Sequence, residues 1–176
     1  LTLLTLLLTL TPPTHASDKS SSSTTVGILI PDWSVTIPSY ASTAASVTAI
    51  NALETTYLVS CLASAPTSLC HIEHPWTIIQ GETTASLTGV YTAWSSGSDA
   101  VTATRDLACS FTSRTESVSC TLSYKATGTF DGSSYATSTS TKGKFATDQV
   151  EYDQLLVTGG VESFTKPQAT KTPGVA

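Results

Sequence analysis

Short apolar runs recur along most of this chain at intervals of about ten residues, and nearly all of them alternate with polar positions. Alternation with a period of two places successive side chains on opposite faces of a strand. Turn-forming pairs such as Gly81-Glu82 and Asp131-Gly132 separate the runs, and no stretch keeps a helical period. The sequence therefore predicts an all-β fold, either an antiparallel β-sandwich or a small barrel.

The expected strands lie at residues 26–30, 46–50, 55–60, 76–80, 85–94, 101–111, 118–124 and 150–157. Residues 41–52 are rich in alanine and could form a helix, but alternating β-branched residues there favour a strand. A polar turn at 113–116 joins two of the runs into a hairpin, and residues 95–99 are expected to form a loop. Short strands and turns are expected from Gly128 onward, with one turn at 142–144.

The four cysteines are expected to form two local disulfides. In an exported chain they should pair, and three connectivities are possible. Pairing of Cys61 with Cys70 and of Cys109 with Cys120 fits best, because the second pair falls at matching heights on the two arms of the hairpin. Each bridge would close a loop of about ten residues, worth about 2.5–3 kcal/mol. A zinc site is the alternative, but neither pair has the Cys-x2-4-Cys spacing typical of zinc ligands.

The amino-terminal part of the chain indicates export. An apolar run at residues 1–10 ends at a Pro-Pro pair, and small residues then favour signal cleavage after Ala16. Three threonines along one side of this run leave a buried amphipathic helix as the alternative. The expected organisation is a signal peptide remnant (1–16), a Ser/Thr-rich linker (17–25), a β-rich disulfide-bonded domain (26–165) and a flexible tail (166–176).

Composition narrows the expected surface chemistry. Charged residues make up 12% of the chain against a usual value of roughly 25%, while serine and threonine supply about a third of it. Such a surface suits O-glycosylation, whereas the single asparagine, Asn51, is not in an Asn-x-Ser/Thr acceptor. The net charge of −5 without a basic cluster argues against nucleic acid as a partner.

Aromatic residues supply the candidate carbohydrate-binding positions. Trp33, Trp76 and Trp94 could line a sugar-binding face, because flat aromatic rings stack on sugars. Packing in the core or in turns is the alternative, and it is favoured for tryptophan in general.

The sequence signal for a metal site is weak. His71, Glu73 and His74 lie within four residues, and the first two would share one side of an extended segment. A polar surface turn explains the same residues, and Pro75 excludes a helical His-x-x-x-His site. A second, acidic group consists of Asp148, Glu151 and Asp153. These carboxylates could bind calcium or hydrolyse a glycoside, although a solvated strand edge is the favoured interpretation.

No catalytic signature is present. The chain has no Gly-x-Ser-x-Gly motif. An amino-terminal histidine brace for copper would require a signal cut before His15, together with His71 or His74. Cleavage after Ala16 is the better match and removes that brace.

Several features follow one another in a fixed order: a secretory leader, a Ser/Thr linker, Thr-Thr-Tyr-Leu-Val-Ser-Cys61, a short loop to Cys70, Trp-Thr-Ile-Ile-Gln-Gly81, and the pair Cys109 and Cys120. In this order the chain resembles a group of small secreted fungal cell-surface proteins of the GPI-anchored or cell-wall type. The resemblance implies a β-rich, disulfide-closed, O-glycosylated ectodomain at the wall or plasma membrane. The residues up to Ala176 do not include the hydrophobic tail of a GPI signal, so a lipid anchor, the sole membrane contact expected, would need further sequence.

These observations predict a non-catalytic secreted protein of the cell surface or cell wall, without a cofactor. Its expected partners are wall polysaccharide or wall glycoproteins. A polysaccharide-binding module is the alternative, followed by a secreted copper- or zinc-dependent enzyme.

Overall fold

The computed structural model describes residues 22–31, 42–66, 69, 70, 72, 74–111 and 117–166. Nine strands in these ranges hydrogen-bond into one sheet in the order β1-β9-β2-β3-β4-β5-β6-β7-β8. The strands are β1 (Thr24–Pro31), β2 (Thr43–Ile50), β3 (Glu54–Cys61), β4 (Trp76–Gly81), β5 (Thr84–Ser96), β6 (Asp99–Phe111), β7 (Val118–Phe130), β8 (Ser133–Phe145) and β9 (Val150–Gly159). Two short 3-10 helices, η2 (Thr147–Gln149) and η3 (Val161–Thr165), flank β9. None of the described residues belongs to a helix long and apolar enough to cross a bilayer.

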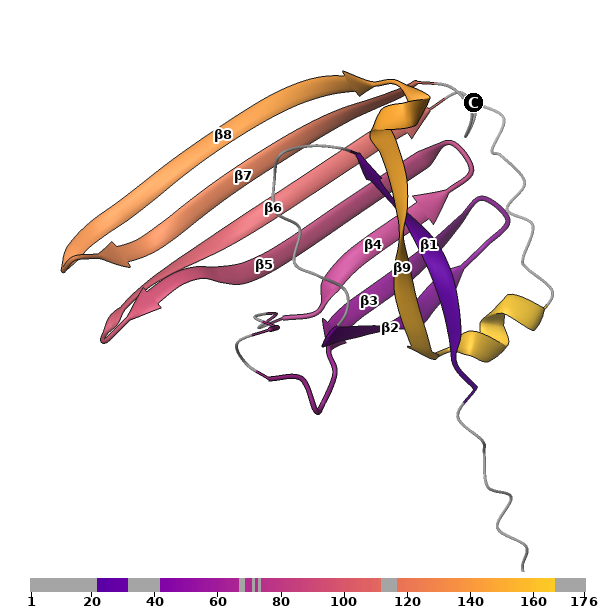
Figure 1. Ribbon diagram of the computed structural model, residues 1–176, viewed down its shortest axis with the longest axis horizontal. Coiled ribbons are helices and arrows are strands. Elements are labelled where there is room, and N and C mark those ends of the chain that lie inside the picture. The colour runs from indigo at the N-terminus through magenta and orange to yellow at the C-terminus, as the bar shows by residue number, and fades with distance from the viewer. Residues whose placement is uncertain are drawn as a thin grey trace, which may run out of the picture.

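The strands from β2 to β8 form an antiparallel meander, after which the chain returns across the sheet as β9. β9 pairs with β1 in antiparallel register and with β2 in parallel register. In Figure 1 the sheet curls into a half-barrel, and the β1–β9 pair crosses in front of it. The predicted all-β fold is confirmed, with one curled sheet in place of two stacked ones. The parallel β2–β9 pair is the exception to the predicted antiparallel order.

The second half of the sheet consists of four strands of 13 residues each, β5 to β8, which are longer than predicted. Gly128 lies inside β7. Glycine is needed there because a Cβ at this position would collide with the carbonyl oxygen of Ala100 on β6. The predicted turn at 142–144 is wrong, since these residues continue β8 and pair with 119–121 of β7. Glycine at position 128 therefore marks close backbone contact and not a chain reversal.

Other predicted boundaries also shift. β1 begins at Thr24, inside the predicted linker, and the predicted loop at 95–99 shortens because β5 and β6 extend into it. Several predicted segments lie outside the described residues: the signal remnant 1–16, residues 17–21 of the linker, the hairpin turn 113–116 and residues 167–176 of the tail.

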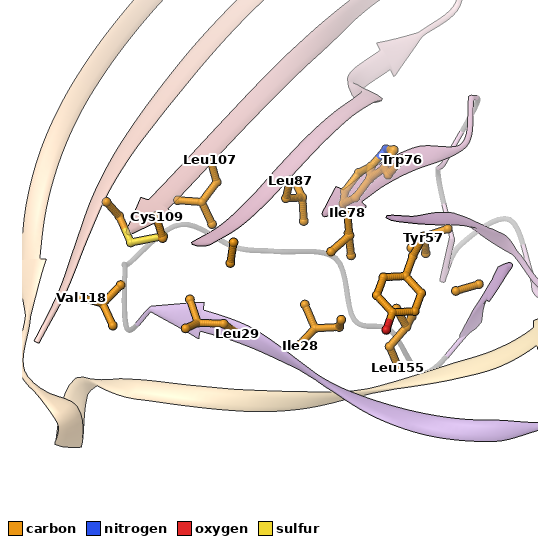
Figure 2. Packing of buried hydrophobic residues seen from close by; sticks show 14 of the residues in the cluster. Ile28, Leu29, Tyr57, Trp76, Ile78, Leu87, Leu107, Cys109, Val118 and Leu155 are labelled. Carbon is orange, nitrogen blue, oxygen red and sulfur yellow. A yellow bond between two sulfur atoms is a disulfide. The ribbon is translucent and has the colours of Figure 1, made fainter. Parts of the chain in front are cut away.

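The main core lies between the β1–β9 pair and the inner face of the sheet. Figure 2 shows Ile28 of β1 on one side of this core and Tyr57 and Ile78 of the sheet on the other. Trp76 is the largest of the fully buried side chains, with 1% of its surface exposed. The run at 55–60 is therefore confirmed as part of a core strand.

Both predicted disulfides are present. Cys61 and Cys70 are joined across the loop that follows β3, with Cα atoms 5.8 Å apart. Cys109 and Cys120 face each other in the β6–β7 register, with Cα atoms 4.1 Å apart. Disulfides form and persist in oxidising compartments, so the two bridges indicate an extracellular or secreted protein.

A side chain closes the edge of β1 that faces away from β9. The Nε2 of Gln80 on β4 donates to the carbonyl oxygen of Gly27 at 2.8 Å, and its Oε1 accepts from the backbone N–H of Leu29 at 3.0 Å. Leu29 is 5% exposed, so water has little access to its backbone. The carboxamide therefore replaces two of the bonds that a neighbouring strand would supply.

Replacing this side chain is expected to loosen β1. Gln80→Ala should lower the free energy of unfolding by about 1–3 kcal/mol, because it leaves the buried N–H of Leu29 and the half-buried carbonyl of Gly27 without their partner. A urea titration of the two proteins measures the difference. Gln154→Ala is the matched control, since Gln154 is exposed on β9, and it should change stability by no more than about 0.5 kcal/mol. If Gln80→Ala were as stable as the wild type, the amide clamp would not hold β1.

Candidate functional site

The inner face of the sheet continues beyond the β1–β9 pair. In Figure 1 strands β5 to β8 run well past β1 and β9, so this part of the face carries no covering strand among the described residues. Side chains from four strands gather there. We call them the distal inner surface, which consists of Tyr91, Trp94, Arg105, Tyr124, Phe130 and Tyr135.

A small second core supports this surface. Val101, Ala103 and Ala126 are buried there, apart from the main core. Their side chains are short, so larger residues of the neighbouring strands pack over them: Tyr91, Trp94 and Tyr124. The distal inner surface therefore rests on packed apolar residues and is not a set of freely moving side chains.

Three aromatic rings form its outer part. The ring centroids of Trp94 and Phe130 are 4.7 Å apart, and those of Phe130 and Tyr135 are 6.3 Å apart, with interplanar angles of 50° and 49°. Aromatic pairs prefer such tilted arrangements. Phe130 is 45% exposed and Tyr135 is 41% exposed, so apolar ring surface remains open to solvent. The cluster can accept the flat apolar face of a ligand.

A β-bulge brings Trp94 into this group. The β5–β6 register shifts between Thr92 and Trp94. Tyr91 lies before the shift and Trp94 after it, so both reach the inner face although strict alternation would place them on opposite faces. Trp94 then lies opposite Val101 of the small core, within reach of Phe130.

A buried arginine lies at the end of the surface nearest the main core. Arg105 is 6% exposed, and its Nη2 donates a hydrogen bond to the phenolic oxygen of Tyr91 at 3.1 Å. Its guanidinium carbon also lies 5.4 Å from the centroid of the Tyr91 ring, within the range of a cation–π contact. The Tyr91 ring is in turn 6.0 Å from that of Trp76. Tyr91 thus connects the main core to the distal inner surface.

Tyr124 supplies a phenol beside this arginine. It lies opposite Arg105 in the β6–β7 register. Burial raises the pKa of Tyr124, and Tyr91 and Tyr135 raise it further, while Arg105 acts in the opposite sense. The phenol is therefore neutral at physiological pH, and it can donate or accept a hydrogen bond but does not act as a base.

A polar hollow lies largely on the opposite face of the same strands, because most of its lining residues alternate with those of the distal inner surface. Its volume is about 370 Å³, and the Oγ atoms of Ser123 and Ser140 lie 3.2 Å apart beside it. Hydroxyl groups, one carboxylate and one ammonium group contribute to its lining, which consists of Asp106, Ser123, Tyr124, Lys125, Ser138, Thr139 and Ser140. These groups offer hydrogen bonds to a hydroxylated ligand.

The three tryptophans that were predicted to line a sugar-binding face do not lie together in the structure. Trp33 lies outside the described residues. Trp76 belongs to the core, where its Nε1 donates to the carbonyl oxygen of Val90 at 2.9 Å, so its ring is not available for stacking on a sugar. Trp94 lies half-buried on the distal inner surface.

The two exposed partners of Trp94, Phe130 and Tyr135, were not predicted from the sequence. The signal that could have found them is the Asp-Gly pair at 131–132, which is typical of a two-residue hairpin turn. Such a turn makes Phe130 and Ser133 direct partners, and it thereby places Tyr135 on the neighbouring strand close to Phe130.

The weak metal ligands are not brought together in the described part of the chain. His74 is exposed, whereas His71, Glu73 and His15 lie outside the described residues. The described residues contain no group of three or more histidine, cysteine, aspartate or glutamate side chains that could hold a metal ion.

The second acidic group lies on an exposed surface. Asp148, in η2, and Glu151 and Asp153, in β9, are all exposed. Glu151 and Asp153 pair with β1 on one side, and the pairing of β9 with β2 is confined to Val157 and Gly159 among the described residues, so the solvated strand edge stays a prediction.

Comparison with known proteins gives a family and a fungal relative. A family model described as "Domain of unknown function (DUF8768)" matches residues 21–157, a range that includes the whole distal inner surface. The "Notoamide biosynthesis cluster protein N'" of Aspergillus versicolor is 44% identical over 138 residues, which is 78% of this chain. The chain spans 32% of the length of that relative. No solved structure matches the chain. The relative is fungal, as the resemblance implied, while the wall location and the anchor stay predictions.

Proposed function

This chain belongs to the family described as Domain of unknown function (DUF8768), and from its geometry we propose a non-catalytic, exported cell-surface domain that binds wall polysaccharide on the distal inner surface. The observation that carries the proposal is the ring cluster of half-buried Trp94 with exposed Phe130 and Tyr135, on a face that no described strand covers. Exposed apolar patches of this kind mark binding surfaces.

The surroundings of the rings favour a sugar over a purely apolar ligand. Sugar rings combine an apolar face of C–H groups with a rim of hydroxyls, so they bind where aromatic rings meet hydrogen-bonding groups. Thr137 and Thr139 of β8 are exposed beside Tyr135, and they alternate onto the same face of that strand. The phenol of Tyr124 adds a further hydrogen-bonding group next to Thr139.

The proposed location follows from the surface of the same strands. Residues 133–142 of β8 are all exposed, and seven of these ten are serine or threonine. Such a strand presents many acceptors for O-linked sugar, as expected of a protein that is part of a cell wall or cell surface. Export through an oxidising compartment agrees with the two disulfides.

Retention on an insoluble polysaccharide tests the proposal. The purified protein should bind insoluble β-glucan or chitin, and Trp94→Ala and Tyr135→Ala should each weaken binding about tenfold, because one stacking ring is worth about 1.5 kcal/mol. Tyr152→Ala is the matched control, since Tyr152 is 39% exposed on β9, away from the distal inner surface.

Circular dichroism first confirms that each variant is folded. The proposal is rejected if no wall polysaccharide retains the protein, or if all three tyrosine and tryptophan variants bind as the wild type does. Weakening by Tyr152→Ala alone would move the site to the other side of the molecule.

The Aspergillus versicolor relative is named for a biosynthesis cluster, which favours a second candidate function: binding of a small molecule from such a cluster. The same rings would hold such a ligand. In that case β-glucan and chitin fail to retain the protein, while a soluble aromatic compound quenches tryptophan fluorescence and the quenching is lost in Trp94→Phe.

A further inference from the structure

The two edges of the sheet differ in how their backbone groups are satisfied. At the β1 edge the side chain of Gln80 bonds the backbone of Gly27 and Leu29. At the other edge lies β8, which pairs with β7 along all 13 of its residues and with no other strand in the described part of the chain. Figure 1 shows β8 as the outermost long strand. An edge of this length is a template for pairing with another chain.

The hairpin turn decides which residues of β8 present their backbone to that edge. Asp131 and Gly132 have φ values of 50° and 71°, as in a two-residue type I′ turn, so Phe130 and Ser133 form the hydrogen-bonded pair that closes it. The pattern alternates along an antiparallel ladder. Odd-numbered residues of β8 therefore bond to β7, and the N–H and C=O groups of even-numbered residues, Ser138 among them, point to the free edge.

Charge is unevenly distributed along this strand. Its beginning adjoins two carboxylates, because Asp99 accepts a hydrogen bond from the N–H of Gly132 at 2.7 Å and Asp131 lies in the same turn. Its other end carries Lys142 and Lys144, which are both exposed. An antiparallel partner with the same sequence would bring the lysine end of each strand to the acidic turn of the other, whereas a parallel partner would oppose like charges.

We propose that β8 pairs with β8 of a second copy of this chain, antiparallel and centred on Thr137, so that two sheets join into one. In this register the even-numbered residues pair through their backbones, as the turn requires. Thr137 lies opposite its own counterpart, and Tyr135 lies opposite Thr139 of the second copy, an aromatic and β-branched pair of the kind that stabilises sheets. Lys142 falls opposite Gly132 of the second copy and beside its Asp131. The two distal inner surfaces then lie on the same side of the joined sheet.

Sedimentation equilibrium of the full chain tests the pairing. The wild type should have twice the monomer mass, and Ser138→Pro should have the monomer mass, because proline removes an N–H at the free edge and none that bonds to β7. Lys142→Glu with Lys144→Glu, which leaves the backbone unchanged, should also give a monomer. Lys125→Glu, an exposed charge reversal on β7, is the control and should remain dimeric.

A cysteine at the centre of the pairing tests the register. Thr137→Cys should form a disulfide-linked dimer under mild oxidation, because residues in directly opposed, non-hydrogen-bonded positions are close enough to be bridged. Thr127→Cys, exposed on β7, should not. The proposal is overturned if the wild type is monomeric at every concentration, or if folded Ser138→Pro and the double lysine variant both stay dimeric. Loss of the dimer in Trp94→Ala alone would assign the interface to the aromatic rings instead. None of these outcomes depends on whether the protein binds polysaccharide.

Discussion

Replacing Trp76 with alanine is expected to lower the free energy of unfolding by about 3–5 kcal/mol. The side chain is 1% exposed, packs against Tyr91 and donates a hydrogen bond to the carbonyl oxygen of Val90. Its removal leaves a large cavity and a backbone acceptor without its partner. For a domain of this size the melting temperature should fall by roughly 6–20 °C, as measured by circular dichroism.

A double-mutant cycle with Gly89 makes this prediction specific. The indole ring lies directly over Gly89, and a Cβ there would come within 2.5–2.7 Å of ring atoms. Gly89→Ala should therefore destabilise the wild type. In the Trp76→Ala background the same change should be neutral or stabilising, since the ring is gone and alanine suits a strand better than glycine. Equal costs in both backgrounds would contradict the stacking of the ring on Gly89.

Removal of the disulfide between Cys109 and Cys120 is expected to be comparably severe. Replacing both cysteines with alanine should lower the free energy of unfolding by about 3–5 kcal/mol, from the lost loop constraint and from lost packing. The two residues are 5% and 2% exposed and belong to the main core. Denaturant titrations of the oxidised proteins measure the effect.

The other bridge provides the internal comparison. Cys61 and Cys70 close a loop of similar length, with a sequence separation of 9 against 11, so the entropic contributions are nearly equal. Cys61 is only half-buried. Replacing both Cys61 and Cys70 with alanine should therefore lower the free energy of unfolding by about 2–3 kcal/mol. If removing Cys61 and Cys70 proved the costlier change, burial in the core would not explain the difference.

Local sequence signals predicted most of the strands. The runs at 26–30, 55–60, 76–80 and 150–157 all lie within strands of the sheet. The alternation of such runs can be recognised in the sequence because the face on which a strand residue lies depends only on its position relative to its immediate neighbours. The same holds for Cys109 and Cys120, whose pairing follows from their positions on one hairpin.

Glycine and serine-rich stretches misled the prediction. The Gly143 region looked like a turn and the hydroxyl-rich run before it looked like a set of short pieces, yet both belong to β8. That strand is held through its backbone ladder to β7 and not by burial, since almost all of its side chains are exposed. A strand that buries little leaves little hydrophobic pattern to read.

The sequence by itself determined that this protein is built of β-strands with two local disulfides, because strand alternation and hairpin pairing depend on residues close together in the chain. Only the tertiary structure decided which tryptophan is core and which is surface. Trp76 is buried in the main core, to which the distant strands β1 and β9 contribute, while the register shift after Thr92 turns Trp94 toward Phe130. The two outcomes depend on contacts between distant segments and on a one-residue irregularity in strand pairing. Neither can be recognised from the alternation of residues along the sequence.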